Sequence, residues 1–211
     1  MTVTSISQPL SGCRLDRERR PAVFLDRDGT IVREVNYLSR LEDLELLAGV
    51  GQAIARLNRS DLPVILVSNQ SGVARGLFDT AFVERCHQRL QELLAPCGAR
   101  LDAFFFCPHH PTAGRPPYRK TCDCRKPAPG MLLTAARKFR LELTASFVIG
   151  DKECDLELAA AVGARGILVA TGYGRQTAAE MTKRGAPPDP FCRDLGAAVD
   201  WIEERLSRPE S

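Results

Sequence analysis

Short apolar runs alternate with segments of helical spacing along most of the chain. Consecutive apolar residues predict buried strands at 22–25, 63–67, 103–106, 146–149 and 166–169. Apolar residues recurring every three or four positions predict helices at 49–58, 80–94, 129–139, 155–162 and 195–206, with Thr80 as the N-cap of the second. Regular alternation of strand and helix predicts an α/β fold: a doubly wound, Rossmann-like parallel sheet with helices on both faces.

Three segments fall outside this alternation. Residues 32–47 lie between the first strand and its helix and predict a short flap over the end of the sheet. Residues 107–125 are rich in Pro, Gly and Cys, and a loop of this length in a compact domain needs a function or a covalent or metal staple. Residues 1–20 are mostly polar and predict a poorly ordered tail, which leaves 21–207 as a single domain.

Composition narrows the class of protein. A chain of 211 residues with 44% hydrophobic and 26% charged residues is typical of one globular domain. The net charge is only +3, spread along the chain, which argues against a nucleic-acid partner. No apolar run approaches the roughly 20 residues of a membrane span, and the N-terminus lacks a secretory h-region. We therefore expect a cytoplasmic monomer without a membrane partner.

Polar side chains follow the predicted strands at their carboxyl ends, where parallel sheets bind ligands. The residues are Asp26 and Asp28 after the first strand, Ser68 and Asn69 after the second, Asp151 and Lys152 after the fourth, and Lys126 before the helix at 129–139. Carboxylates suit Mg²⁺, while hydroxyl and lysine groups hold phosphate oxygens. Each motif alone is also typical of a turn or a helix cap. Their joint occurrence predicts a phosphoryl-transfer site.

A cysteine and histidine cluster occupies the long loop. Cys107, Cys122 and Cys124 lie there with His109 and His110, whereas the other cysteines are scattered. In a reducing compartment such a cluster favours a metal, and a disulfide between Cys122 and Cys124 is disfavoured by their spacing. Three thiolates and one imidazole form a closed, structural Zn²⁺ site, which would supply folding energy to a loop without a core. A set of free thiols is the alternative.

The motifs Asp26-x-Asp28-Gly29-Thr30, Ser68-Asn69, Lys126-Pro127 and Gly150-Asp151-Lys152-x-x-Asp155 resemble those of the haloacid dehalogenase-type phosphatases over about residues 21–175. The resemblance implies that Asp26 attacks phosphorus to form an aspartyl-phosphate. It implies that Asp28 first protonates the leaving oxygen and then activates water. It also implies that Ser68 and Lys126 hold the phosphoryl group. Mg²⁺ would be bound by Asp26, Asp151 and Asp28, the last through its backbone carbonyl.

The strings Phe106-Cys107-Pro108-His109-His110-Pro111, Cys122-Asp123-Cys124-Arg125-Lys126-Pro127 and 69–76 closely resemble the D-glycero-D-manno-heptose 1,7-bisphosphate 7-phosphatases. This resemblance implies removal of the C7 phosphate during nucleotide-heptose synthesis for lipopolysaccharide or surface glycans. It implies that Zn²⁺ is held by Cys107, His109, Cys122 and Cys124. The implied substrate contacts are Glu34, Asn36, Tyr37, Ser68, Asn69, Gln70, Ser71, Arg125, Lys126 and Lys152.

A sugar bisphosphate needs a cation for its second phosphate, and the planar guanidinium of Arg125 suits that role. Three other functions remain open at this stage. The first is a histidinol-phosphate phosphatase, a relative with a similar zinc loop. The second is a zinc-stabilised binding module without activity, against which the complete set of motifs argues. The third is a phosphotransferase, because an acyl phosphate could pass to an acceptor other than water.

Overall fold

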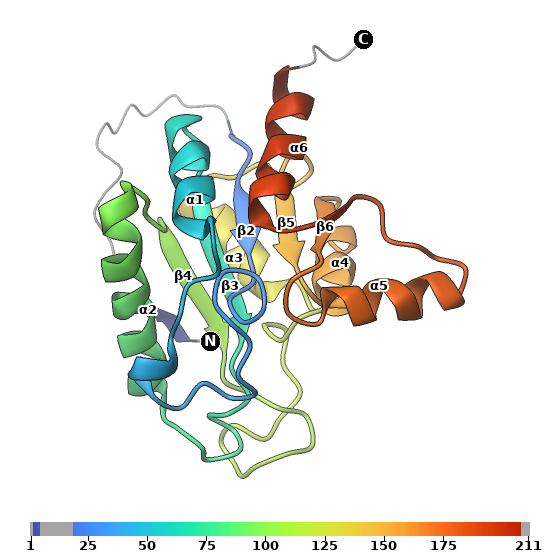
Figure 1. Ribbon diagram of the computed structural model, residues 1–211. Coiled ribbons are helices and arrows are strands. Elements are labelled where there is room, and N and C mark those ends of the chain that lie inside the picture. Colours follow the sequence, from blue (N-terminus) through green and yellow to red (C-terminus); the bar gives the residue numbers. More distant parts are fainter. Residues whose placement is uncertain (1, 5–18, 208–211) are drawn as a thin grey trace.

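One sheet runs through the protein in the computed structural model, which describes residues 2–4 and 19–207 (Figure 1). Its strands among these residues are β1 (Thr2–Thr4), β2 (Val23–Leu25), β3 (Val64–Asn69), β4 (Ala103–Cys107), β5 (Phe147–Gly150), β6 (Arg165–Val169) and β7 (Phe191–Cys192). Their order is β1-β4-β3-β2-β5-β6-β7, with β2 at the centre. Strands β2 to β7 pair in parallel, and β1 pairs antiparallel with β4. The predicted doubly wound sheet is confirmed.

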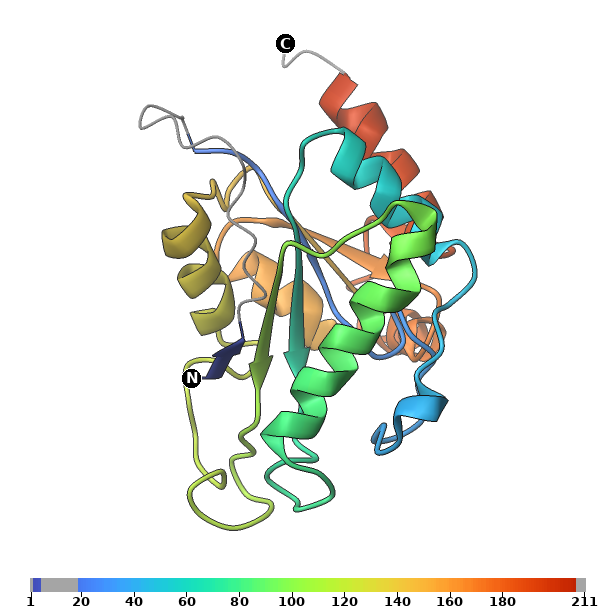
Figure 2. The same ribbon diagram turned by 90° about the vertical axis from the view of Figure 1, so that its left-hand side faces the viewer.

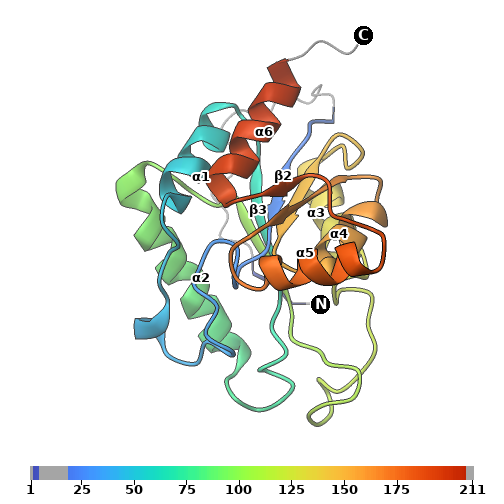
Figure 3. The ribbon, with the colours of Figure 1, turned by 45° about the vertical axis from the view of Figure 1, so that its right-hand side comes forward.

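Helices cover both faces of the sheet, as the views in Figures 1 and 3 show. They are α1 (Val50–Arg59), α2 (Thr80–Leu94), α3 (Gly130–Phe139), α4 (Glu153–Ala160), α5 (Gly174–Lys183) and α6 (Leu195–Ser207), with short 3₁₀ turns η1 (Leu41–Asp43) and η2 (Ala95–Cys97). Apolar side chains of α1, α2 and α6 share a core with Val23 and Leu25, whereas those of α3 and α4 pack with Phe24. This alternation follows from the period of two in a strand.

The central strand β2 gives the following turn a rigid base. All three of its residues are fully buried. Burying a side chain of this size stabilises the fold by about 1.5–3 kcal/mol. Because β2 pairs with β3 on one side and β5 on the other, the residue that follows it, Asp26, has a backbone held from both sides. Asp26 N itself donates to Ile149 O at 2.9 Å.

The predicted helices and strands are confirmed to within one or two residues at each end, but four features differ. Asp79, not Thr80, caps α2, because the Asp79 carboxylate accepts from Phe82 N at 2.7 Å and Thr80 is already helical. The sequence did not predict α5, β7 or β1. Helix α5 buries only Gly174 and Ala178, so it has no apolar stripe to detect.

Within the segment predicted as a poorly ordered tail, the structure has one short strand, β1 (Thr2–Thr4), which pairs antiparallel with β4. Figure 2 shows this short strand beside β4 at the edge of the sheet. An edge strand offers unpaired N–H and C=O groups, and a β-branched segment can complete them. The rest of the tail prediction lies outside the described residues, apart from 19 and 20.

The two irregular segments follow the prediction. The flap at 32–47 folds back on itself, since Val32 forms an antiparallel bridge with Leu46 and Arg33 N donates to Glu45 O at 2.9 Å. The loop at 107–125 contains no helix and no strand beyond Cys107. Within residues 2–4 and 19–207, no helix is long and apolar enough to span a bilayer.

Candidate active site

A cavity of about 460 Å³ opens at the carboxyl ends of β2 and β3. Except for Asp151, every residue predicted to act on or bind the substrate or Mg²⁺ lines it. These are Asp26, Asp28, Glu34, Asn36, Tyr37, Ser68, Asn69, Gln70, Ser71, Arg125, Lys126 and Lys152. The flap contributes Glu34, Asn36 and Tyr37, and the end of the long loop contributes Arg125 and Lys126. Five segments of the chain carry these residues and meet at one edge of the sheet.

Lys126 is a buried cation that lines this cavity. Its Nζ donates to Asp26 Oδ1 and to Asp155 Oδ1, both at 2.6 Å, and to Val67 O at 3.1 Å. Burial alone would lower the pKa of Lys126, but the carboxylates of Asp155 and Asp26 outweigh it, so the pKa is raised and the group stays charged. Lys126 is therefore placed to neutralise a phosphoryl group attached to Asp26.

Asp151 is a fully buried carboxylate with an oxygen within 4.8 Å of an oxygen of Asp26. Its Oδ2 accepts from Tyr173 N at 2.8 Å, while Oδ1 is buried without a hydrogen-bond partner among the described residues; Lys152 Nζ is 3.4 Å away. Burial, reinforced by the charge of Asp26, raises the pKa of Asp151 to about 7. The backbone leaves room for this carboxylate only because residue 29 is glycine: φ is +86°, and a Cβ there would clash with Asp151 Oδ2.

These carboxylates fit Mg²⁺. Oxygens of Asp26, Asp151 and Asp155 lie within 4.8 Å of one another and are buried. Oxygen ligands are what a hard divalent cation requires, and Asp151 Oδ1 is a buried oxygen without a hydrogen bond among the described residues. The side chain of Asp28 stands outside this group and is held by Arg27 and Gln70, so the implied contact of Asp28 with Mg²⁺ is left to its backbone carbonyl. Asp155 is a candidate ligand that the sequence analysis did not assign.

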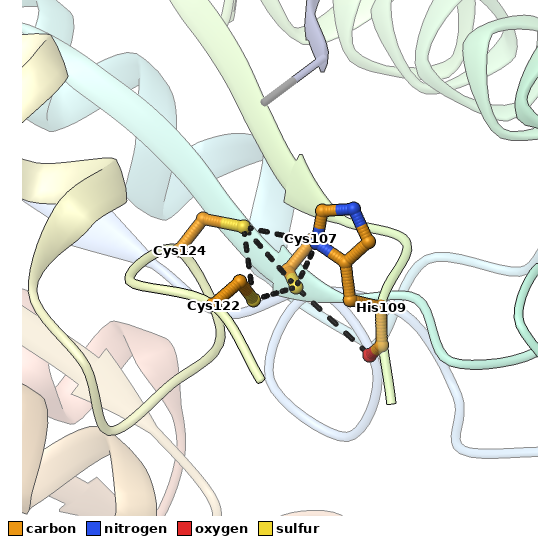
Figure 4. A group of neighbouring side chains, drawn as sticks. All are labelled: Cys107, His109, Cys122 and Cys124. Carbon is orange, nitrogen blue, oxygen red and sulfur yellow. Dashed lines mark hydrogen bonds between the residues drawn. The ribbon is translucent and has the colours of Figure 1, made fainter. Parts of the chain in front are cut away.

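The four predicted zinc ligands converge on one point, as Figure 4 shows. The Sγ atoms of Cys107, Cys122 and Cys124 are 3.4–3.5 Å apart. His109 Nδ1 lies 3.7 Å from Cys107 Sγ and 3.5 Å from Cys124 Sγ. Tetrahedral Zn²⁺ with Zn–S bonds of about 2.3 Å would place its ligand atoms about 3.5–3.8 Å apart. The cluster therefore fits a closed structural zinc site.

His109 rather than His110 faces the thiols. His110 Nδ1 instead accepts hydrogen bonds from Thr112 N at 3.2 Å and from Ala113 N at 2.9 Å, which folds the loop back on itself. Only one histidine is thus available to the cluster, as the resemblance implies.

Hydrogen bonds link the segment that carries Arg125 and Lys126 to the zinc cluster and to Asn69 at the end of β3. Arg125 Nη1 donates to His109 O at 3.1 Å. Asn69 pairs with the backbone of Lys126 in both directions, its Nδ2 donating to Lys126 O at 3.1 Å and its Oδ1 accepting from Lys126 N at 3.0 Å. A metal that orders the loop would therefore also fix where Arg125 and Lys126 enter the cavity.

Several lining residues were not predicted as site residues: Arg27, Leu38, Gly72, Cys154 and Tyr173. Tyr173 follows β6, so the rule that placed the other strand-end residues could have found it. Lys152 Nζ lies 4.8 Å from the centroid of the Tyr173 ring and 3.3 Å from Glu34 Oε2. Arg27 separates the two aspartates of the first motif, and nothing in its sequence context signals that it is buried.

Comparison with known proteins agrees with this geometry. A HAD-hydrolase-like family profile matches residues 123–198. A D-glycero-D-manno-heptose-1,7-bisphosphate 7-phosphatase of Thermosynechococcus vestitus is 47% identical over 192 residues, covering 89% of this chain and 98% of the relative. The D-glycero-beta-D-manno-heptose-1,7-bisphosphate 7-phosphatase of Escherichia coli K12 is 41% identical, covering 89% of this chain and 90% of the relative.

Solved structures agree as well. The D,D-heptose 1,7-bisphosphate phosphatase of B. bronchiseptica, complexed with magnesium and phosphate, is similar with a TM-score of 0.77 and 37% identity, covering 88% of this chain and 99% of that one. The corresponding phosphatase of Burkholderia thailandensis has a TM-score of 0.62 and 31% identity, covering 90% and 100%. With such identity over almost the whole length of these relatives, the chain belongs to the D-glycero-D-manno-heptose-1,7-bisphosphate 7-phosphatase family of the HAD-type hydrolases.

Proposed function

We propose that this protein is a Mg²⁺-dependent phosphatase that removes the C7 phosphate of D-glycero-D-manno-heptose 1,7-bisphosphate and leaves heptose 1-phosphate. The observation that carries the proposal is the placement of Asp26 in the cavity. Its carboxylate follows the rigid strand β2, is 5% exposed, and has Lys126 Nζ 2.6 Å from Oδ1. A nucleophile beside a buried ammonium is suited to forming and carrying a phosphoryl group.

The reaction then proceeds in two steps. Asp26 attacks phosphorus, the bond from phosphorus to the C7 oxygen breaks, and Asp28 gives its proton to that oxygen. Water next attacks the aspartyl-phosphate, Asp28 takes a proton from the water, and the bond from phosphorus to Asp26 breaks to release orthophosphate. Lys126 and the Ser68 hydroxyl hold the phosphoryl oxygens throughout. When bound by Asp26, Asp151 and the Asp28 carbonyl, Mg²⁺ supplies further positive charge against the phosphate.

The second phosphate accounts for the cations at the rim. Arg125 projects from the zinc loop and is fixed by its bond to His109 O. Its planar guanidinium suits a phosphate that is not being transferred. The proposed contacts of the sugar also line the cavity: Glu34, Asn36, Tyr37, Asn69, Ser71 and Lys152. A volume of about 460 Å³ is in the range of small-molecule sites.

The proposed setting is the cytoplasm, with the chain acting as a monomer and Zn²⁺ serving only to order the loop. The free cysteines of the described chain support a reducing compartment. Light scattering that returns the 23.2 kDa mass of one chain would support the monomer, and a larger mass would reject it.

A phosphate-release screen tests the substrate. The purified protein with Mg²⁺ is offered both anomers of heptose 1,7-bisphosphate, fructose 1,6-bisphosphate and histidinol phosphate. The proposal predicts the highest kcat/KM on a heptose bisphosphate. Turnover confined to histidinol phosphate would assign the chain to the alternative activity, and transfer of phosphate to an added alcohol in preference to water would indicate a phosphotransferase.

A further inference from the structure

We infer that Arg27 and Gln70 are positioning residues that hold the carboxylate of Asp28 for proton transfer. The inference rests on the proposed function and concerns the same site. The sequence predicts Gln70 as a substrate contact and predicts no role for Arg27.

Two nitrogens of the Arg27 guanidinium contact the carboxylate of Asp28. Its Nε lies 3.0 Å from Asp28 Oδ1 and 3.1 Å from Oδ2, and its Nη2 lies 2.9 Å from Oδ2. Arg27 is 2% exposed, which is exceptional for arginine, whereas the side chain of Asp28 remains 20% exposed. A buried guanidinium is costly unless its charge is matched. The arrangement therefore fixes the plane of the Asp28 carboxylate while one part of it still reaches the cavity.

Gln70 contacts both Arg27 and Asp28, and we call Arg27 and Gln70 together the clamp of Asp28. Gln70 Oε1 accepts from Arg27 Nη2 at 3.0 Å, and its Nε2 donates to Asp28 Oδ2 at 2.9 Å and to Ser68 Oγ at 2.8 Å. Both hydrogens of the amide are thus engaged, and the side chain is 4% exposed. The amide of Gln70 has no donor left for a sugar hydroxyl. It links the acid/base Asp28 to Ser68, the hydroxyl that holds the phosphoryl group.

The two carboxylate oxygens of Asp28 receive different numbers of contacts from the clamp. Within the described chain, Oδ2 takes contacts from Arg27 Nε, Arg27 Nη2 and Gln70 Nε2, whereas Oδ1 takes only that from Arg27 Nε. Oδ1 therefore keeps the free acceptor capacity and is the oxygen that carries the transferred proton. The clamp is anchored in turn, because Gln70 N donates to Cys107 O at 2.8 Å, at the first zinc ligand.

Asp28 acts in both steps of the proposed reaction, first as proton donor to the C7 oxygen and then as proton acceptor from water. A carboxylate that is no longer held in place should transfer both protons less well, while the residues that bind the substrate stay where they are. Loss of either Arg27 or Gln70 should therefore lower kcat and leave KM nearly unchanged.

The test compares Arg27→Met, Arg27→Lys and Gln70→Met with wild type, using Arg100→Met as the control. The side chain of Arg100 is 59% exposed, pairs with Asp102, and lines no part of the cavity. The assay measures kcat and KM of each protein. A cooperative thermal unfolding transition in each variant shows that the variant is folded. Any phosphate monoester that wild type hydrolyses serves as substrate.

We expect kcat to fall about 10- to 100-fold in Arg27→Met and Gln70→Met, part of the contribution of a placed acid/base, with KM changing much less. Arg27→Lys keeps the charge without the planar fork that contacts both carboxylate oxygens, so it should also lose kcat with little change in KM. If Met does not fold at position 27, Arg27→Lys and Gln70→Met still carry the test.

Two results would overturn the inference alone: folded variants with wild-type kcat, or a rise in KM at unchanged kcat, which would make Gln70 a substrate contact. A wild-type protein active on a different phosphate monoester would overturn only the assigned substrate. A wild-type protein without turnover of any phosphate monoester would overturn the proposed function and this inference together.

Discussion

Replacing Asp151 with asparagine is expected to stabilise the metal-free protein at pH 8, although it removes a predicted metal ligand. Asp151 is fully buried, and its pKa is raised from an ordinary 3.8 to about 7, first by burial and next by Asp26. In the unfolded chain this carboxyl ionises near pH 4. Between pH 4 and 7 the unfolded state has therefore released a proton that the native state retains, so this group makes the native state less stable as pH rises.

At 1.36 kcal/mol for each pH unit, the penalty above pH 7 reaches ~4 kcal/mol. Asparagine removes the charge but places an N–H group where Asp151 Oδ1 now has no hydrogen-bond partner, at a cost of about 1–3 kcal/mol. The net gain is about 1–3 kcal/mol at pH 8. The gain should shrink as pH falls and reverse between about pH 4.5 and 6, where the charge penalty drops below the cost of the unpartnered N–H group.

Urea unfolding in a chelator at pH 8 and pH 5 measures this difference. Comparing variant with wild type at each pH cancels every group that the two proteins share. Glu157→Gln, on the exposed side of α4, is the matched control and should be nearly neutral. Added Mg²⁺ should stabilise wild type at pH 8 and have little effect on Asp151→Asn. The reasoning is refuted if metal-free Asp151→Asn is less stable than wild type at pH 8, or if Mg²⁺ stabilises both equally.

Two further predictions concern the zinc loop and the core. Metal analysis of freshly purified protein should find about one zinc per chain, and Cys122→Ser should lower that content and make residues 107–125 sensitive to protease; absence of zinc from wild type would reject the site. His87 is fully buried, stacks on Phe104 at 4.5 Å, and has no hydrogen-bond partner on either ring nitrogen within the described chain. Burial, helped by Arg27, lowers its pKa to about 3, so the native state fails to take up the proton that the unfolded state binds below pH 6.5. Stability is therefore lost as pH falls, and His87→Phe should remove about 2 kcal/mol of that loss between pH 7 and 5 in urea unfolding; an equal pH dependence in both proteins would contradict this.

The sequence predicted those parts of the site that depend on strand ends. Asp26, Ser68 and Asp151 each follow an apolar run, and a parallel sheet must bring such positions to one edge. Lys126 was predicted from its place before the helix at 129–139, and Arg125 from the need of a second phosphate for a cation. The same rule could have found Tyr173, which follows β6.

Other parts could not be predicted because they depend on tertiary contacts without a periodic signal. Arg27 looks like a surface residue, and only the structure shows that Asp28 and Gln70 neutralise and enclose it. Asp155 was identified as part of a motif, but its pairing with Lys126 depends on a side-chain contact across 29 residues. Helix α5 buries only Gly174 and Ala178, and β1 depends on pairing with β4 at the edge of the sheet.

Phosphorus NMR of the reaction with heptose 1,7-bisphosphate tests the central claim most directly, because it shows which phosphate leaves. Wild type with Mg²⁺ should convert the bisphosphate to heptose 1-phosphate and orthophosphate. Asp26→Asn should produce neither while remaining folded by circular dichroism. Loss of the C1 phosphate, no release from the bisphosphate, or equal turnover by Asp26→Asn would contradict the account.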